Sequence, residues 1–287
     1  MNRITGTTQV FFILGDPVAQ VRAPEVYNPL FERHGVDAVL VPLKLAAEAL
    51  PGFMAHGMQA QNIRGLSATI PHKAALFSLL NPADPVAQVA GAVNAVRRHP
   101  DGRLEAALFD GIGFVKGLDH FGVTVPGRRV LVVGAGGGGH AVAAALAQRA
   151  PSMLAIYNRT AERAQGLVDR LEHYATGELA VAASADPAGF DLIVNCTSMG
   201  LEPDDPLPFD PSRVDAGAAV IDIIMTRTPT PLLRECRARG IKAEAGYEML
   251  VQQVPEFLRF MGFDALAQTL QADLGEVRAA LYPKQVR

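Results

Sequence analysis

A run of glycines directly after an apolar segment is the first feature of this sequence that indicates chemistry. Gly134, Gly136 and Gly139 fit the spacing G-x-G-x-x-G after the apolar segment 130–133, and the alanine-rich segment 141–150 that follows is predicted to be helical. A pyrophosphate group can approach the backbone closely only where side chains are absent, and the N–H groups of a helix N-terminus favour its charge. The succession of strand, loop and helix therefore predicts a dinucleotide-binding site. A glycine-rich turn without a ligand and a methyltransferase loop are the alternative interpretations.

The residues at the end of the next predicted strand favour one dinucleotide over another. An NAD site usually has an acidic residue about 20 positions beyond the glycines, where it binds the ribose 2′-hydroxyl. Here the strand 154–157 is followed by Asn158, Arg159 and Thr160, with Arg163 one helical turn later. Two guanidinium groups can bind a 2′-phosphate through several donors, which favours NADP and leaves NAD as the alternative. Thr160 can also serve as an ordinary helix N-cap, and the two interpretations are compatible.

Polar residues at strand ends in the first third of the chain are candidates for a substrate site. Thr69 and Lys73 lie where a predicted strand gives way to a helix, and Asp110 directly follows another predicted strand. Such strand ends are where α/β proteins place their sites. A surface lysine and a helix N-cap are the simpler interpretations of Lys73 and Asp110. Asn94 lies in an apolar stretch, where a polar side chain must find partners or lose stability.

A glutamine near the C-terminus is predicted to point inward. The apolar face of the predicted helix 248–261 is formed by Leu250, Val254, Phe257, Leu258 and Met261. At helical spacing Gln253 falls inside this face, whereas Gln252 falls on the polar face. A buried amide needs a hydrogen-bonding partner, which can be a ligand.

The order of these motifs resembles the shikimate dehydrogenase family over essentially the full length of the chain. The matching segments are Gly65–Lys73 (G-x-N-V-T-V-P-x-K), Ala90–Ala95 (A-G-A-V-N-T), Ala107–Gly111 (D-N-T-D-G, of which D-G remains), Gly134–Gly137 (G-A-G-G), Asn158–Arg163 (N-R-T-x-x-R), Asn195–Gly200 (N-A-T-S-x-G) and Gly246–Gln253 (G-x-x-M-L-V-x-Q). The resemblance implies an α/β fold with a discontinuous α/β substrate-binding domain, residues 1–112 and 246–287, and a Rossmann NADP-binding domain, residues 113–245.

The resemblance also implies a role for each matching residue. Lys73 and Asp110 would be the catalytic pair, and Thr69, Asn94 and Gln253 would contact hydroxyl groups of the substrate. The implied cofactor-binding residues are Gly134, Ala135, Gly136, Gly137, Gly138, Asn158, Arg159, Thr160, Arg163, Thr197, Ile223 and Gly246. The implied reaction is reversible NADP-dependent hydride transfer between a cyclic hydroxy acid and its ketone, without a metal, in aromatic amino acid biosynthesis.

Three departures from the family pattern concern the binding of a substrate carboxylate. The family motif G-x-P-x-x-H-S-x-S-P corresponds to residues 15–24, where Val21 and Ala23 replace the two serines. Met225 stands where the family motif Y-D-M-x-Y ends in tyrosine. A separate departure, before the end of the strand that leads to Lys73, is Ser67 in place of an asparagine. A shikimate-like acid or a related cyclitol is therefore expected rather than shikimate itself. Arg22, or a backbone N–H near Gln20, could bind the carboxylate instead.

Two other functions fit the same motifs. An NADP(H)-binding regulatory or sensor protein with a decayed substrate site would explain the missing serines, but the presence of both Lys73 and Asp110 opposes it. A different Rossmann enzyme that uses the same cofactor is the third hypothesis. Turnover of the cofactor with a panel of cyclitols and hydroxy acids distinguishes these hypotheses.

The predicted elements alternate along the chain, as in a parallel sheet covered on both faces. Predicted strands are 10–14, 38–43, 63–70, 93–97, 104–109, 129–133, 154–157, 181–183, 192–195 and 219–224, of which 93–97 and 104–109 form a hairpin through Asp101 and Gly102. Helices are predicted at 25–34, 46–56, after Pro71 and at 111–120, and two more helices are predicted from Glu248 onward.

The composition excludes several other classes of protein. A net charge of −3 and a pI of about 6.2 argue against nucleic acid or an anionic membrane as the main partner. Cys196 and Cys236 are the only cysteines, which supports neither a disulfide scaffold nor a zinc site. No apolar run reaches the length of about 18 residues that a membrane span needs. We expect a cytoplasmic monomer or homodimer that acts on a small molecule.

Overall fold

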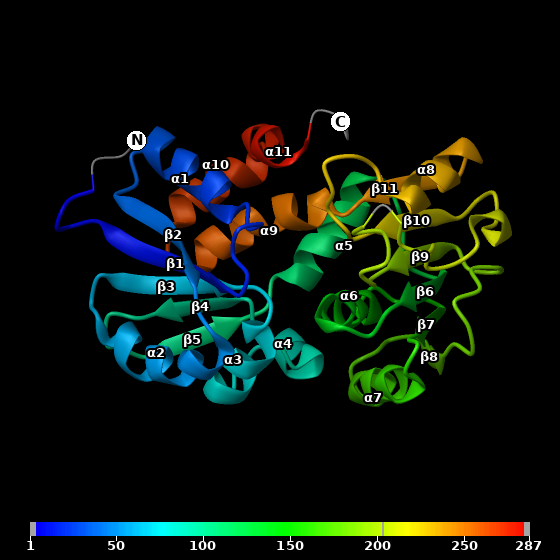
Figure 1. Cartoon of the computed structure of the whole chain (residues 1–287), viewed down its shortest axis with the longest axis horizontal. Coiled ribbons are helices and arrows are strands. Elements are labelled where there is room, and N and C mark those ends of the chain that lie inside the picture. Colours follow the sequence, from blue (N-terminus) through cyan, green and yellow to red (C-terminus); the bar gives the residue numbers. More distant parts are fainter. Residues whose placement is uncertain (1–3, 203, 284–287) are drawn as a thin grey trace. The chain divides into compact units, whose positions relative to one another are not determined.

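The chain forms two compact units. The computed structural model describes residues 4–202 and 204–283 (Figure 1). The first unit comprises the chain up to Phe109 together with Val254–Leu281. The second unit comprises Asp110–Gln253 and the end of the chain from Tyr282.

The first unit is built on a mixed sheet with the strand order β2-β1-β3-β4-β5. Its strands are β1 (Gln9–Gly15), β2 (Ala38–Lys44), β3 (Ile63–Ala68), β4 (Ala95–Arg98) and β5 (Leu104–Ala107). β1, β2 and β3 run parallel, whereas β4 and β5 form the predicted antiparallel hairpin. The carboxyl ends of the three parallel strands therefore lie at one edge of the sheet, where a site is expected.

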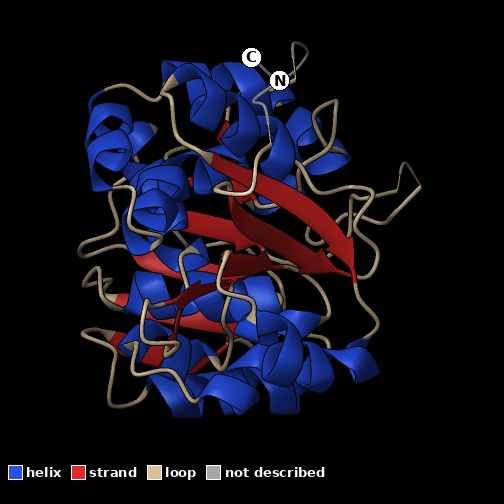
Figure 2. Ribbon diagram, turned by 90° about the vertical axis from the view of Figure 1, so that its left-hand side faces the viewer, coloured by secondary structure: helices blue, strands red, loops and turns tan. Residues whose placement is uncertain are grey.

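Helices cover both faces of this sheet (Figure 2). Successive side chains of a strand point to opposite faces, so neighbouring apolar residues of β1 contact helices or loops on different sides. On one face the Phe11 ring contacts Phe31 and Phe263, and on the other face Phe12 contacts Phe53. The helices of the unit are α1 (Ala23–Arg33), η1 (Ala47–Ala49), α2 (Leu50–His56), η2 (Gly57–Gln59), α3 (His72–Leu80), α4 (Pro85–Ala90), α10 (Asp264–Ala272), α11 (Gly275–Leu281) and the second half of α9 (Tyr247–Phe260).

The second unit is built on a parallel sheet with the strand order β11-β10-β9-β6-β7-β8. Its strands are β6 (Arg129–Val133), β7 (Met153–Tyr157), β8 (Glu178–Val181), β9 (Leu192–Asn195), β10 (Ala219–Asp222) and β11 (Lys242–Ala245). Its helices are α5 (Asp110–His120), α6 (Gly137–Ala147), α7 (Ala161–Leu171), η3 (Pro211–Arg213), α8 (Pro231–Ala238) and the first half of α9. The central strands are apolar and buried along almost their whole length, as expected for a parallel sheet covered on both faces. This arrangement confirms the predicted α/β class with a Rossmann-like unit.

Several elements differ from their prediction. β11 was not predicted, because Lys242 and Glu244 alternate with alanines and give a short, charged segment typical of a sheet edge. α4 was not predicted either, although Asp84 caps its N-terminus by accepting a hydrogen bond from the Val86 N–H. β8 ends at Val181 instead of beginning there. The described part of the C-terminal segment holds three helices instead of the two that were predicted.

The limits of the compact units differ from the predicted domain boundaries. The units divide after Phe109 and after Gln253, whereas the family resemblance places the boundaries after residues 112 and 245. The difference arises because α5 packs closely against the first half of α9, so that both belong to the second unit. The boundaries drawn from the resemblance remain a prediction.

Candidate active site

The loop after β3 carries Thr69 and Lys73 at the carboxyl edge of the first sheet. The Thr69 N–H donates to the Leu14 carbonyl oxygen at 2.9 Å, which continues the pairing of β3 with β1. A Cβ atom on Gly15 would lie 2.7 Å from the Thr69 methyl group, so the glycine makes room for this threonine. Lys73 is half-buried in the first turn of α3, and its carbonyl oxygen accepts the Val93 N–H at 3.0 Å. The predicted positions of both residues at a strand end are therefore confirmed.

His72, immediately before Lys73, fastens this loop to the end of β2. Its ring is fully buried, and Nε2 lies 2.9 Å from the carbonyl oxygen of Leu45. The Leu45 N–H in turn donates to the Gly15 carbonyl oxygen at 3.1 Å. Because a carbonyl oxygen only accepts, Nε2 is the donor in this hydrogen bond. The residue thus joins the ends of three neighbouring strands, a role that the sequence did not reveal.

Asn94 lies at the start of the β4–β5 hairpin and is 7% exposed. Its Oδ1 accepts the Phe109 N–H at 2.9 Å, and its carbonyl oxygen accepts the Ala68 N–H at 2.9 Å. The expectation that this buried amide finds partners is confirmed. The contact also fixes the residue that directly precedes Asp110 in the chain.

The segment that differs most from the family pattern contains Val21 and Ala23, both partly buried. Between them, Arg22 directs Nε to the Glu25 carboxylate at 2.6 Å and a terminal nitrogen to the Ala280 carbonyl oxygen at 3.0 Å. Two guanidinium nitrogens are therefore engaged by the protein itself, which argues against Arg22 as a ready-made carboxylate ligand. Ser67 Oγ is buried, with no hydrogen-bonding partner among the described residues.

In the second unit, Asp110 and Gln253 lie on two helices in close contact. Asp110 is buried at the start of α5, and Gln253 is buried on α9, as its helical phase predicts. A Cβ atom on Gly113 of α5 would overlap the Met249 carbonyl oxygen and lie 3.1 Å from Cβ of Gln253. The absence of a side chain at Gly113 therefore allows the two helices to approach, and it fixes the helix of Asp110 against the helix of Gln253.

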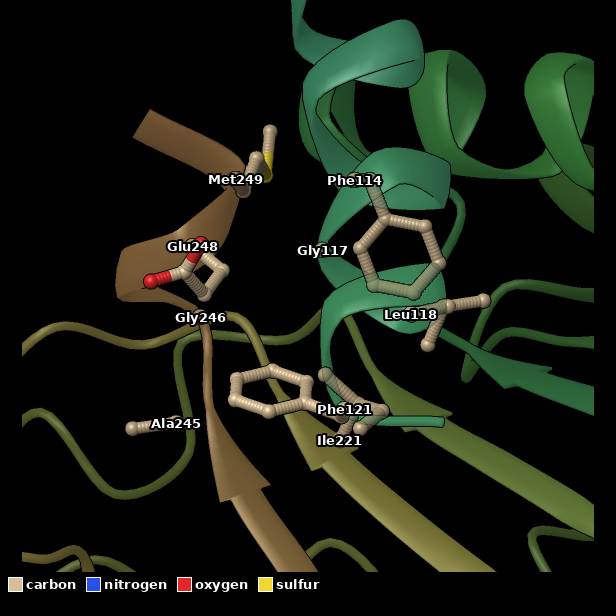
Figure 3. Close-up of a pocket in the computed structure, with 9 residues that line it drawn as sticks. All are labelled: Phe114, Gly117, Leu118, Phe121, Ile221, Ala245, Gly246, Glu248 and Met249. Carbon is tan, nitrogen blue, oxygen red and sulfur yellow. The ribbon is translucent and has the colours of Figure 1, made fainter. Parts of the chain in front are cut away.

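A small cavity lies beside this helix contact, between α5 and the beginning of α9 (Figure 3). Its volume is about 10 Å³, and Phe114, Phe121, Gly246 and Glu248 are among the residues that line it. Such a space holds about one water molecule. The cavity is therefore a packing gap and not the substrate site.

The glycine loop follows β6 and leads into α6 as predicted. Gly134 has a φ of +111°, and a Cβ atom there would lie 2.9 Å from the Cys196 carbonyl group. A Cβ atom on Gly139 would overlap the Gly134 carbonyl oxygen. Gly136 and Gly137 are exposed, and a Cβ atom on either would meet nothing within 4 Å. Gly134 and Gly139 are thus required by the fold, whereas Gly136 and Gly137 leave space in front of the first turn of α6.

The end of β7 presents the cationic residues predicted to select NADP. Asn158 accepts the Ala135 N–H at 3.1 Å and donates to the Thr160 carbonyl oxygen at 2.9 Å, which holds the two loops together. Arg159 and Arg163 are exposed, and neither guanidinium has a hydrogen-bonding or ion-pair partner within residues 4–202 and 204–283. Thr160 is the N-cap residue of α7 but makes no side-chain capping bond.

Thr197 and Ile223, which the resemblance also implies, border the glycine loop, and Gly246 lies against Ile223. A Cβ atom on Gly134 would lie 3.0 Å from the Thr197 nitrogen, and one on Gly138 would lie 2.9 Å from Cδ1 of Ile223. A Cβ atom on Gly246 would lie 2.7 Å from the Ile223 Cα. The loops after β9 and β10 therefore reach the glycine loop, and the loop after β11 packs against the loop after β10.

Comparisons with known proteins agree with this arrangement. The profile of the shikimate dehydrogenase substrate binding domain matches residues 13–96, and that of shikimate/quinate 5-dehydrogenase matches residues 118–200. The shikimate dehydrogenase (NADP+) of Rubrobacter xylanophilus is 37% identical over 97% of each chain. The chain belongs to the shikimate dehydrogenase family. It is an NADP-dependent oxidoreductase that acts on a CH–OH group.

Solved structures of relatives show the same fold. The shikimate 5-dehydrogenase of Thermus thermophilus in complex with NADP(H) and shikimate is 30% identical, with a TM-score of 0.79 over 91% of this chain and 99% of that chain. The 5-ketofructose reductase of a Gluconobacter species is 27% identical, with a TM-score of 0.78 over 93% of this chain and 99% of that chain. Proteins with this fold are thus named for chemically different substrates.

The second unit of this shikimate dehydrogenase family member fits NADP. The open space at Gly136 and Gly137 admits a pyrophosphate close to the backbone. Arg159 and Arg163, which have no partner in the described part of the chain, suit a 2′-phosphate. Within the described ranges 4–202 and 204–283, no helix is long and apolar enough to cross a bilayer, and no cluster of His, Cys, Asp or Glu side chains could hold a metal.

Proposed function

We propose that this enzyme catalyses reversible NADP-dependent hydride transfer between a cyclic polyol and its ketone, and that shikimate itself is a poor substrate. The observation that carries the proposal is the combination of Thr69, Lys73 and Asn94 at one sheet edge with apolar residues at the positions of the carboxylate-binding serines. A substrate that keeps the hydroxyl groups of shikimate but has an altered or differently bound acidic end fits this combination.

The reaction assigns a role to each catalytic candidate. Oxidation of an alcohol removes a hydride from carbon and a proton from oxygen, and NADP+, when bound, accepts the hydride. Lys73 accepts the hydroxyl proton at Nζ, and Asp110 holds the lysine and the hydroxyl group in line for this transfer. Thr69, Asn94 and Gln253 bind the remaining hydroxyl groups, which holds the reacting carbon in place.

The altered acidic end is supported by the surroundings of Val21, Ala23 and Met225. None of these side chains can donate a hydrogen bond to a carboxylate. Met225 packs against the apolar core of the second unit, and Arg22 is engaged by Glu25 and Ala280. Burial of a carboxylate without donors carries a large desolvation cost. The related 5-ketofructose reductase is named for a ketose, which is consistent with a substrate other than shikimate.

The proposal is tested by following NADP+ reduction with a panel of cyclic polyols and hydroxy acids, in the wild type and in Lys73→Ala. We expect turnover of at least one polyol, and a loss of about 10²–10⁴-fold in Lys73→Ala, the usual range for a lost general base. NADPH binding should be retained in that variant, since Lys73 lies outside the second unit.

Arg103→Ala is the matched control, because Arg103 is an exposed cation in the β4–β5 hairpin at the opposite edge of the same sheet. It should turn over substrate at the wild-type rate. Wild-type-like turnover in a folded Lys73→Ala protein would show that another group moves the proton. Failure of every alcohol in the panel, with NADPH binding intact, would favour a regulatory protein.

A further inference from the structure

A buried carboxylate at the end of β10 is not explained by the roles described so far. Asp222 and Asn195 are the last residues of the neighbouring strands β10 and β9, lie opposite each other in register, and are both 0% exposed. Asp222 Oδ1 accepts Asn195 Nδ2–H at 3.0 Å and the Ile224 N–H at 3.2 Å, and Oδ2 accepts the Thr230 hydroxyl at 2.7 Å. All three partners are donors, as an ionised carboxylate requires.

Asn195 extends this network into the loop after β9. Its Oδ1 accepts both the N–H of Thr197, at 3.1 Å, and the Thr197 hydroxyl, at 2.7 Å. Thr197 Oγ1 then accepts the Met199 N–H at 3.1 Å, and Asn195 Nδ2 also lies 3.3 Å from the Met199 carbonyl oxygen. The loop is therefore folded around the Asn195 amide, whose orientation is set by Asp222.

The residues that this network fixes are those that touch the glycine loop. A Cβ atom on Gly134 would lie 3.0 Å from the Thr197 nitrogen, and one on Gly138 would lie 2.9 Å from Cδ1 of Ile223. Ile223 stands between Asp222 and Ile224, and the Ile224 N–H is bound by the Asp222 side chain. The carboxylate thus controls one contact at each end of the glycine loop.

We infer that Asp222, itself held by the Thr230 hydroxyl, is a positioning residue for the dinucleotide: it acts through Asn195 and the Ile224 N–H to hold Thr197 and Ile223 against the glycine loop, without touching the cofactor. The inference rests on the glycine loop being the cofactor site. Burial alone opposes an ionised side chain at Asp222, because desolvation raises the pKa of its carboxyl group. The three hydrogen bonds oppose that shift.

The test compares Thr230→Val with Thr230→Ser, and adds Asp222→Asn. Valine removes the hydroxyl that donates to Asp222, whereas serine keeps both that bond and the cap on the Leu233 N–H. We expect Thr230→Val and Asp222→Asn to raise the Kd for NADPH, measured by fluorescence titration, by roughly tenfold or more, because a hydrogen bond to a charged group is lost. Thr230→Ser should stay within about twofold of the wild type.

Asp186→Asn serves as the stability control. Asp186 pairs with Arg213 in the loops that precede β9 and β10, at the sheet edge opposite the glycine loop. It should leave the Kd for NADPH unchanged. Thr230→Val and Asp222→Asn proteins that melt at lower temperature but bind NADPH like the wild type would overturn the inference and leave the cofactor site intact. A wild type that fails to bind NADPH would overturn the cofactor site as well. If Asp222→Asn does not fold, the two Thr230 variants decide.

Discussion

We propose that the preference for NADP depends on Arg159 and Arg163. Both are exposed at the end of β7, without a partner among the described residues, and no acidic residue stands at the strand end where an NAD enzyme usually has one. The unpaired guanidinium groups need not break an existing ion pair to bind a phosphate.

Arg159→Ala should therefore weaken NADP(H) and hardly affect NAD(H). A hydrogen bond to a charged group contributes about 1.5–3 kcal/mol, so the Kd for NADPH should rise by about one to two decades. Titration of both reduced cofactors measures the effect. Arg170→Ala is the control and should leave both affinities unchanged. Arg170 is an exposed arginine in the last turn of α7, the helix that follows Arg159. Equal weakening of both cofactors in Arg159→Ala would contradict a contact with the 2′-phosphate.

The two cysteines provide a prediction about pH. Burial raises the pKa of the Cys196 thiol well above its usual range, with a further contribution from the Asp222 charge, and burial raises the pKa of Cys236 to about 11. A raised thiol pKa means less thiolate at a given pH. At about pH 8, where an ordinary thiol is partly ionised, the native protein should resist alkylation by iodoacetamide, and both sites should react after unfolding. Rapid labelling of native Cys196, seen by mass spectrometry, would contradict its assignment as a buried core residue.

At the scale of the elements, the glycine loop separates the demands of the fold from those of the ligand. A Cβ atom on Gly139 would overlap the Gly134 carbonyl oxygen, whereas Gly136 has a φ of −91° and open space around its Cα. Gly139→Ala should lower stability by about 1–3 kcal/mol, the usual cost of overpacking. Gly136→Ala should leave stability near that of the wild type.

The same pair should respond differently to the cofactor. A methyl group on Gly136 occupies space that the pyrophosphate needs, so the Kd for NADPH should rise by about one decade or more. Thermal unfolding and NADPH titration of both variants measure the two effects. A Gly136→Ala protein that binds NADPH as tightly as the wild type would show that the pyrophosphate does not approach the loop at this residue.

The elements with a strong local signal were predictable. The glycine loop, the β4–β5 hairpin and the inward phase of Gln253 follow from spacing and turn chemistry within short segments, and the structure agrees with each. The network around Asp222 was not predictable, because Asn195 lies 27 residues away in sequence and only the register of β9 with β10 brings the two together. β11 was missed for a similar reason, since its pairing with β10 outweighs a sequence of low strand propensity.

At the scale of the whole molecule, the proposed site residues are divided between the two units. Thr69, Lys73 and Asn94 belong to the first unit, and Asp110, Gln253 and the cofactor-binding loops belong to the second. α9 contributes to both, with Gln253 as the last of its residues in the second unit. Sequence motifs predict which residues belong to the site. The assignment of α5 and the first half of α9 to one unit depends on their packing at Gly113, which no motif records.

The measurement that most directly tests the proposed substrate class is kcat/KM for shikimate with NADP+, in the wild type and in the double variant Val21→Ser/Ala23→Ser. Each lost hydrogen bond to a carboxylate is worth about one to two decades in binding. The wild type should therefore lie at least two decades below about 10⁵ M⁻¹s⁻¹, an ordinary enzyme value, and the double variant should recover part of the difference. A wild-type value of about 10⁵ M⁻¹s⁻¹ or more would contradict the proposal and show that the carboxylate is bound by other groups.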